Sequence, residues 1–291
     1  MPRSTPTRTP SARRLRRLVT TLVVVALLGV AAVVGLKEVT SRIHTLLPRP
    51  EECTASVGGH EATLNAEQAE NAALISAIAV RRGLPARAVT IALATAMQES
   101  KLYNLEGGDR DSLGLFQQRP SQGWGTRAQV LDPVHAANAF YDALVKIPDF
   151  ETLEITDAAQ RVQRSAYPSA YAKHEPDARA LASALTGFSP HAFTCRFDDP
   201  GAGAGHPAAL SKEVRGLFGA LVQQPVVRGT SVTIGASSRT AGWAVAHYVV
   251  AEAQRLGVRR VSYGGRTWST GDSDAWQHAG PTHGPITITL A

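Results

Sequence analysis

Several common catalytic and cofactor motifs are missing from this sequence of 291 residues. It contains no GxxxxGK[ST] phosphate loop, no HExxH zinc pair and no GxSxG nucleophile turn. Nucleotide-binding proteins, metalloproteases and serine hydrolases therefore have no support from motifs. The nine histidines are scattered along the chain. We accordingly predict no metal site and no cofactor.

Cysteine is also scarce, because only Cys53 and Cys195 are present. Neither belongs to a CxxC pair or has a histidine at ligand spacing, which disfavours a zinc site. A disulfide between them would close a long loop, for which loop entropy predicts a stabilisation of about 4 to 5 kcal/mol. We therefore expect a disulfide between Cys53 and Cys195, formed in an oxidising compartment; the alternative is two separate buried thiols.

Most of the chain carries no excess of positive charge, although the net charge of the whole chain is +6 and its pI is near 9.6. Residues 1–43 contain eight Lys or Arg residues and one acid, which leaves 22 basic and 23 acidic residues in the rest. Residues 44–291 are thus close to neutral in net charge. We therefore expect no nucleic-acid partner.

Residues 18–36 form an uncharged apolar run that is long enough to cross a bilayer as a helix. Arginines in residues 1–17 predict a cytoplasmic N-terminus and domains outside the cell membrane. The run is longer than the apolar core of a signal peptide, so we expect an uncleaved single-pass anchor rather than a secretion signal. A transporter is disfavoured, since transport sites are built between several helices.

Helical periodicity and capping residues predict a mainly α domain over residues 63–197. A stalk over residues 37–62 would precede it, and a Gly/Ala/Pro-rich linker over residues 198–208 would follow. Residues 209–291 alternate helical patterns with β-branched runs, which predicts a small α/β or α+β module. The expected fold class is therefore a mainly α domain with this module and one N-terminal transmembrane helix.

Glu99 follows an almost wholly apolar helical segment, in the stretch MQES. Burial disfavours the ionised form of a carboxyl group, and a helix C-terminus carries partial negative charge, so both effects favour the protonated form. Glycosidases use a neutral carboxylic acid to protonate the leaving oxygen. The alternative interpretation is an ordinary helix end that reaches solvent.

Three short motifs, MQES, SLGLFQQRP and RVQRSAYPSAYAKH, resemble in their order those of the lysozyme-like superfamily, which includes soluble lytic transglycosylases and goose-type lysozymes. The resemblance covers about residues 63–195. It implies cleavage of the β-1,4 bond between N-acetylmuramic acid and N-acetylglucosamine, with peptidoglycan glycan strands as the partner. It also implies that Glu99 is the catalytic acid that protonates the glycosidic oxygen.

The same resemblance implies a set of substrate-binding residues around this acid. Ser100 would form hydrogen bonds beside it, and Tyr167 would correspond to the tyrosine of the family. Pro168 stands where the family has asparagine, which leaves Tyr171 as an alternative tyrosine. The turn that lines the sugar groove would consist of Gly114, Leu115, Phe116 and Gln117.

The family permits two outcomes of the reaction. A transglycosylase needs no second carboxylate, because the muramoyl C6 hydroxyl attacks internally and gives a 1,6-anhydro product. An inverting hydrolase needs a base to activate water, and Asp109 or Asp111 could be that base. Loop aspartates more commonly form turns. We therefore expect a lytic transglycosylase-like enzyme; the alternative is an inactive glycan-binding or cell-wall scaffold protein.

The C-terminal module has a weaker resemblance to zinc D,D-carboxypeptidase-like peptidases, through GWAVAHYVVAEAQRLGVRRVSYGGRTW and PTHGPITITL. Three zinc ligands are not visible, because only His278 and His283 remain near the expected last position. The resemblance thus implies a degenerate module that binds wall peptide or a protein partner without metal. The alternative is a small domain that has no ligand.

Overall fold

The structure is a computed structural model, in which residues 51–291 form one compact unit and residues 1–50 another. It describes the following residues: 17, 19–23, 25, 29, 30, 32, 35, 51–164, 169–197, 205–271, 275–280 and 283–291.

The transmembrane helix expected over residues 18–36 is not found. A bilayer span requires about 20 consecutive apolar residues in one helix. Among the described residues, no helix is both long and apolar enough to meet this requirement. Many of residues 18–36 lie outside the described set. This part of the expected fold class is therefore corrected.

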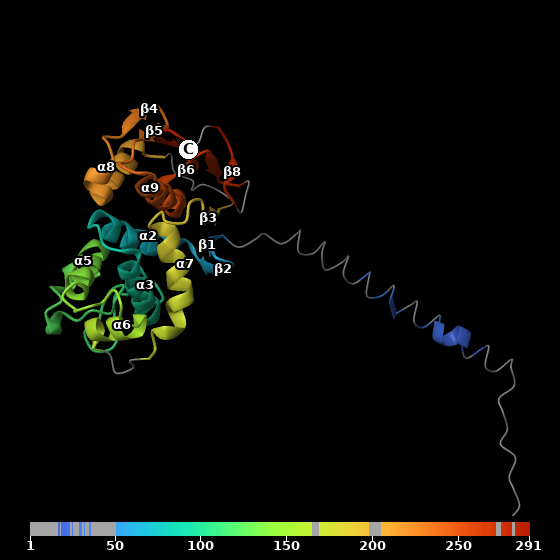
Figure 1. Ribbon diagram of the computed structural model, residues 1–291, viewed down its shortest axis with the longest axis horizontal. Coiled ribbons are helices and arrows are strands. Elements are labelled where there is room, and N and C mark those ends of the chain that lie inside the picture. Colours follow the sequence, from blue (N-terminus) through green and yellow to red (C-terminus); the bar gives the residue numbers. More distant parts are fainter. Residues whose placement is uncertain are drawn as a thin grey trace, which may run out of the picture. The chain divides into compact units, whose positions relative to one another are not determined.

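The first half of the compact unit contains a bundle of helices and a small sheet (Figure 1). Its helices are α2 (Ala66–Arg81), α3 (Ala86–Ser100), α4 (Arg127–Leu131), α5 (Pro133–Leu144), α6 (Ile155–Gln163) and α7 (Glu175–Leu185), with short 3-10 turns η1 (Pro120–Gln122) and η2 (Ala172–His174). Its strands are β1 (Glu52–Val57), β2 (His60–Leu64) and β3 (Phe193–Arg196).

Local sequence signals explain where these helices begin. Asn65 and Gln68 form the predicted capping box of α2, each side chain bonding the other residue's backbone N–H. Asp132 caps α5, whose first residue is Pro133. Between these helices lies α3, whose apolar residues from Ala88 to Ala96 are buried. The central helix is therefore held in the core, and its last turn carries Glu99.

The small sheet corrects the expectation of a mainly α domain. Its strands are antiparallel in the order β2-β1-β3, so a hairpin at the start of the domain pairs with a strand near its end. Gly58 and Gly59, both at positive φ, make the two-residue turn of the hairpin. Cys53 lies opposite Cys195 in the register, and the predicted disulfide between them is confirmed.

The C-terminal part contains a six-stranded sheet in the order β4-β5-β9-β6-β7-β8, and every pair of neighbours is antiparallel. The described residues of this part thus contain no parallel βαβ unit, and the module is α+β rather than α/β. The strands are β4 (Val226–Arg228), β5 (Ser231–Ile234), β6 (Val258–Tyr263), β7 (Arg266–Ser269), β8 (Gln277–His278) and β9 (Ile286–Leu290). The helices are α8 (Pro207–Phe218), η3 (Gly219–Leu221), α9 (Arg239–Ala251) and α10 (Ala253–Leu256).

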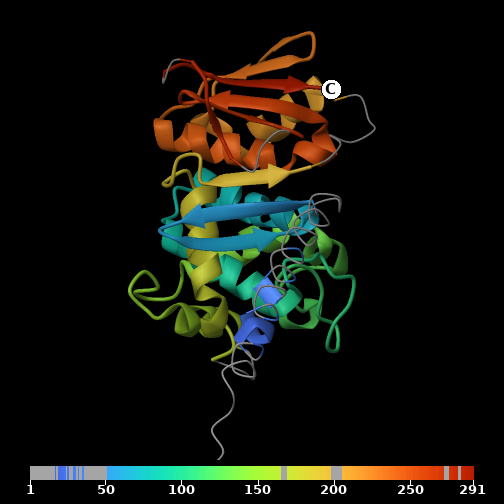
Figure 2. The ribbon, with the colours of Figure 1, turned by 90° about the vertical axis from the view of Figure 1, so that its right-hand side faces the viewer.

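Helix α9 joins the two parts of the unit. Every residue of α9 from Ala241 to Ala251 is buried, because the helix lies between the large sheet and α2 (Figure 2). The Nε1 atoms of Trp268 and Trp276 donate to the carbonyls of Cys195 and Phe193, at 2.9 and 2.8 Å. These indoles satisfy backbone acceptors on β3, so the C-terminal part packs directly on the disulfide-bonded strand.

Candidate active site

Glu99 lies half-buried in the last turn of α3. The helix ends because Lys101 and Leu102 both adopt the left-handed conformation, with φ of 55° and 64°. Their carbonyls accept hydrogen bonds from Gln68 and Asn71 of α2, at 2.9 and 2.8 Å. Carbonyls near a helix end need such partners. Two side chains of a neighbouring helix therefore fix the position of the acid.

Tyr171 is the tyrosine that contacts this acid. Its hydroxyl donates to Oε1 of Glu99 at 2.7 Å, and its side chain is fully buried. No hydrogen bond to Oε2 of Glu99 occurs among the residues that the structure describes. Tyr167, the tyrosine favoured by the motif, lies outside the described residues. The geometry thus holds one oxygen of the carboxyl group by a rigid phenol.

Ser100 connects the acid to the predicted sugar-binding turn. Its hydroxyl donates to the carbonyl of Leu115 at 2.7 Å and also lies 3.0 Å from the carbonyl of Ala96. Ser100 is buried, so this contact is shielded from water. The serine positions the backbone of the turn against the end of α3.

The turn itself is mostly a packing element. Gly114 has a φ of 74°, and a Cβ there would lie 2.6 Å from the carbonyl oxygen of Val130, so only glycine fits. The side chains of Leu115 and Phe116 are fully buried, and Phe116 stacks on Phe140. Of the predicted turn residues, therefore, only one has a partly exposed side chain. That residue is Gln117.

The two candidate bases differ in their surroundings. Asp111 accepts hydrogen bonds from Nε of Arg119 at 2.8 Å and from the backbone N–H and hydroxyl of Ser121. The contacts to Arg119 and then Ser121 hold the pKa of Asp111 well below its usual value. Asp109 is exposed on the same loop. Asp111 therefore has the role of a loop anchor and is a weak base.

Residues that hold the site in place were not predicted from the sequence. Gln163 of α6 donates to the carbonyl of Phe116 at 2.6 Å, and Gln68 and Asn71 hold the end of α3. The capping box identified Gln68 only as part of a helix start. Nothing local in the sequence links these amides to the acid, because their partners are backbone carbonyls from other segments.

No group of three His, Cys, Asp or Glu residues that could hold a metal ion occurs in the described part of the chain. His278 and His283, the residues left from the weaker resemblance, are both exposed. Comparison with known protein families and with curated protein sequences finds no match to this chain.

Proposed function

We propose that this protein cleaves the β-1,4 bond between N-acetylmuramic acid and N-acetylglucosamine in peptidoglycan, with Glu99 as the acid. The observation that carries the proposal is the 2.7 Å contact between the buried Tyr171 hydroxyl and Oε1 of Glu99. A carboxyl group with one oxygen held by a rigid donor has its other oxygen in a defined direction. Such positioning is what general acid catalysis requires.

In this proposal, Glu99 donates its proton to the glycosidic oxygen while the bond from that oxygen to C1 of the muramoyl sugar breaks. The C6 hydroxyl of the same sugar attacks C1 and returns its proton to Glu99, which yields a 1,6-anhydro end. The ion pair of Asp111 with Arg119 favours this route over attack by water. A carboxylate whose pKa lies well below its usual value is a weak base for activating water.

The disulfide between Cys53 and Cys195 supports a place outside the cytoplasm, because oxidising compartments permit disulfides to persist. Peptidoglycan lies in such a compartment. The proposed substrate and the disulfide therefore both support a place outside the cytoplasm for the compact unit.

The test uses purified residues 51–291, which form one compact unit, incubated with isolated cell-wall sacculi. Release of soluble muropeptides is followed by mass spectrometry, with Glu99→Gln as the variant. We expect release by the native protein and loss of release by the variant. Products with anhydro ends, one water lighter than hydrolysed ends, would identify the transglycosylase route. Binding to sacculi without release would instead favour the non-enzymatic glycan-binding protein.

A further inference from the structure

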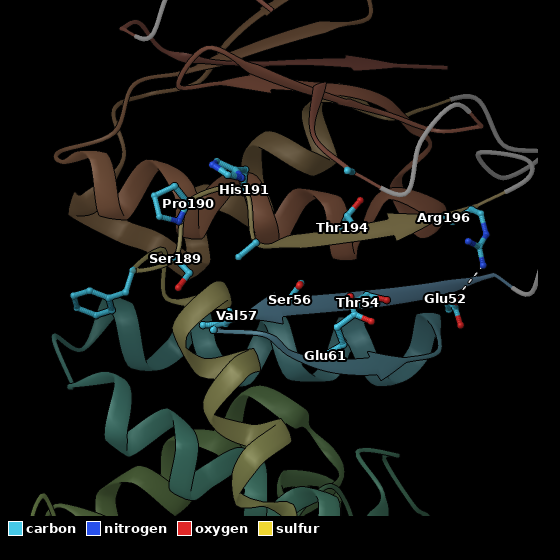
Figure 3. Close-up of a pocket in the computed structure, with 14 residues that line it drawn as sticks. Glu52, Thr54, Ser56, Val57, Glu61, Ser189, Pro190, His191, Thr194 and Arg196 are labelled. Carbon is cyan, nitrogen blue, oxygen red and sulfur yellow. Dashed lines mark hydrogen bonds and ion pairs between the residues drawn. The ribbon is translucent and has the colours of Figure 1, made fainter. Parts of the chain in front are cut away.

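A cavity of about 770 Å³ lies on the outer face of the small sheet (Figure 3), and Glu99 is not among the residues that line it. Tyr171, which contacts Glu99, precedes α7, whereas Phe188, which lines the cavity, follows that helix. The acid and the cavity are therefore associated with opposite ends of α7. A helix of this length separates its ends by about 16 Å. Cavities of this size bind small molecules or short segments of polymers.

The floor of the cavity is polar because side chains alternate along β1. Cys53 and Ala55 face the core, whereas Thr54 and Ser56 face the cavity. The register places Thr54 opposite Thr194, but Oγ1 of Thr194 is buried, so the hydroxyls of β1 that face the cavity are those of Thr54 and Ser56. Figure 3 shows these side chains rising from the strands. Hydroxyls both donate and accept, which suits the amide groups of a peptide.

The wall of the cavity comes from the loop between α7 and β3. Phe188 is 65% exposed, and it is the only aromatic residue among the large hydrophobic residues exposed in the described part of the chain. His191 also lines the wall, and burial followed by the charge of Arg266 lowers its pKa. His191 is therefore neutral near pH 7. The wall offers an apolar surface without adding positive charge.

Opposite charges lie on different strands of the floor. Glu61 is an exposed carboxylate on β2, paired in register with Ser56. Arg196 on β3 is paired in register with Glu52, and their side chains form an ion pair at 2.8 Å. The backbones of Glu61 and Arg196 are four positions apart along the strands and two strands apart, which corresponds to about 16 Å.

We propose that this cavity binds a short extended peptide with a free amine and a free carboxylate. The ammonium group lies at Glu61, and the carboxylate shares the guanidinium of Arg196 with Glu52. An extended peptide of about four residues is about 13 Å long, so side chains reaching inward from these positions meet both ends. The hydroxyls of the floor contact the peptide amides, and Phe188 covers small apolar side chains.

We infer that peptides released from wall glycan are the source, and this source rests on the proposed function. A peptide that is joined to the glycan through one end lacks the charge of that end. Only a released peptide therefore offers both the free amine and the free carboxylate that the cavity would bind.

The probe is tetra-alanine with free ends, titrated calorimetrically into the full chain carrying Glu99→Gln. N-acetylation or C-amidation of the probe each removes one charge, and each should weaken binding about fivefold, as expected for a partly exposed ion pair. Glu61→Gln should weaken binding of the free peptide equally and abolish the effect of N-acetylation. Glu151→Gln, which changes an exposed acid outside the cavity, is the matched control and should change nothing.

Failure of tetra-alanine to bind below about 10 mM would overturn the inference, as would an N-acetylation effect that survives Glu61→Gln. Phe188→Ala should weaken all three probes by the same factor, and no weakening would refute the role of the wall. Cleavage of sacculi by the native protein is measured separately. Cleavage without peptide binding removes only this inference, whereas peptide binding without cleavage supports the cavity and removes the proposed function.

Discussion

Replacement of Tyr171 by phenylalanine tests the proposed acid without disturbing the core. The ring of Tyr171 is fully buried, and phenylalanine preserves its packing. Only the hydroxyl that donates to Oε1 of Glu99 at 2.7 Å is removed. We expect the carboxyl group to lose its fixed direction while the fold remains.

The expected loss of activity follows from the energy of the hydrogen bond between Tyr171 and Glu99. A hydrogen bond to a carboxyl group that ionises during the reaction is worth about 1.5 to 3 kcal/mol. Each 1.36 kcal/mol corresponds to a tenfold change in rate. Tyr171→Phe should therefore lower kcat by about 10- to 160-fold. KM should change little, because the hydroxyl is directed at the acid and not at the sugar.

The assay measures initial rates of muropeptide release from sacculi, together with the free energy of unfolding in urea. Tyr141→Phe is a matched control, since Tyr141 is also fully buried and its hydroxyl donates to a backbone carbonyl, that of Ile75. This control should lose a similar amount of stability and keep its kcat. Tyr167→Phe, at the position favoured by the motif, should also keep its kcat.

An unchanged kcat in Tyr171→Phe would refute the positioning role of this phenol. A loss of kcat in Tyr167→Phe alone would show that the motif identified the correct tyrosine. A loss in all three variants would mean that these tyrosine hydroxyls support activity only through stability.

Three further predictions concern the compact unit. Replacement of both Cys53 and Cys195 by serine should lower the free energy of unfolding by about 4 to 5 kcal/mol, because the disulfide joins residues 142 positions apart. Trp268→Phe should cost about 1 to 3 kcal/mol, since it leaves the carbonyl of Cys195 without its donor. Burial raises the pKa of Glu252 from 4.5 to about 7. The folded protein thus keeps a proton that the unfolded chain loses, and stability should fall by up to about 3 kcal/mol between pH 4.5 and 7, a slope that Glu252→Gln should reduce.

For each of these three predictions, a specific result would contradict it. Urea midpoints that are equal in the oxidised protein and the double serine variant would remove the role of the disulfide. A Trp268→Phe variant as stable as the native protein would show that the indole contact is not needed between the two parts. A pH profile that is identical in Glu252→Gln and the native protein would assign the slope to other groups.

Local signals in the sequence predicted the helices well, because a helix start depends on neighbouring residues. The capping box of Asn65 and Gln68 and the Asp132 cap with Pro133 lie where α2 and α5 begin. The apolar run before Glu99 predicted a buried helix, and α3 is buried. The Gly58–Gly59 turn also had a local signal, a glycine pair between alternating residues, but this segment was interpreted as a stalk.

Pairings between distant segments could not be predicted in the same way. The distant partner of β1 is β3, which begins at Phe193. No local signal in a short strand indicates which distant strand it pairs with. Whether Leu115 and Phe116 face a groove or the core depends on where α5 and α6 pack, and the structure places both in the core.

The sequence alone thus determined the order of helices, the near-neutral charge after the N-terminal end, and the acid at the end of an apolar helix. Tertiary structure decided that Tyr171 contacts Glu99, that Asp111 is held by Arg119, and that Cys53 and Cys195 are bonded. The physical reason is the range of the interactions. Helix starts depend on residues within about one turn, whereas these side chains meet only after distant segments have packed.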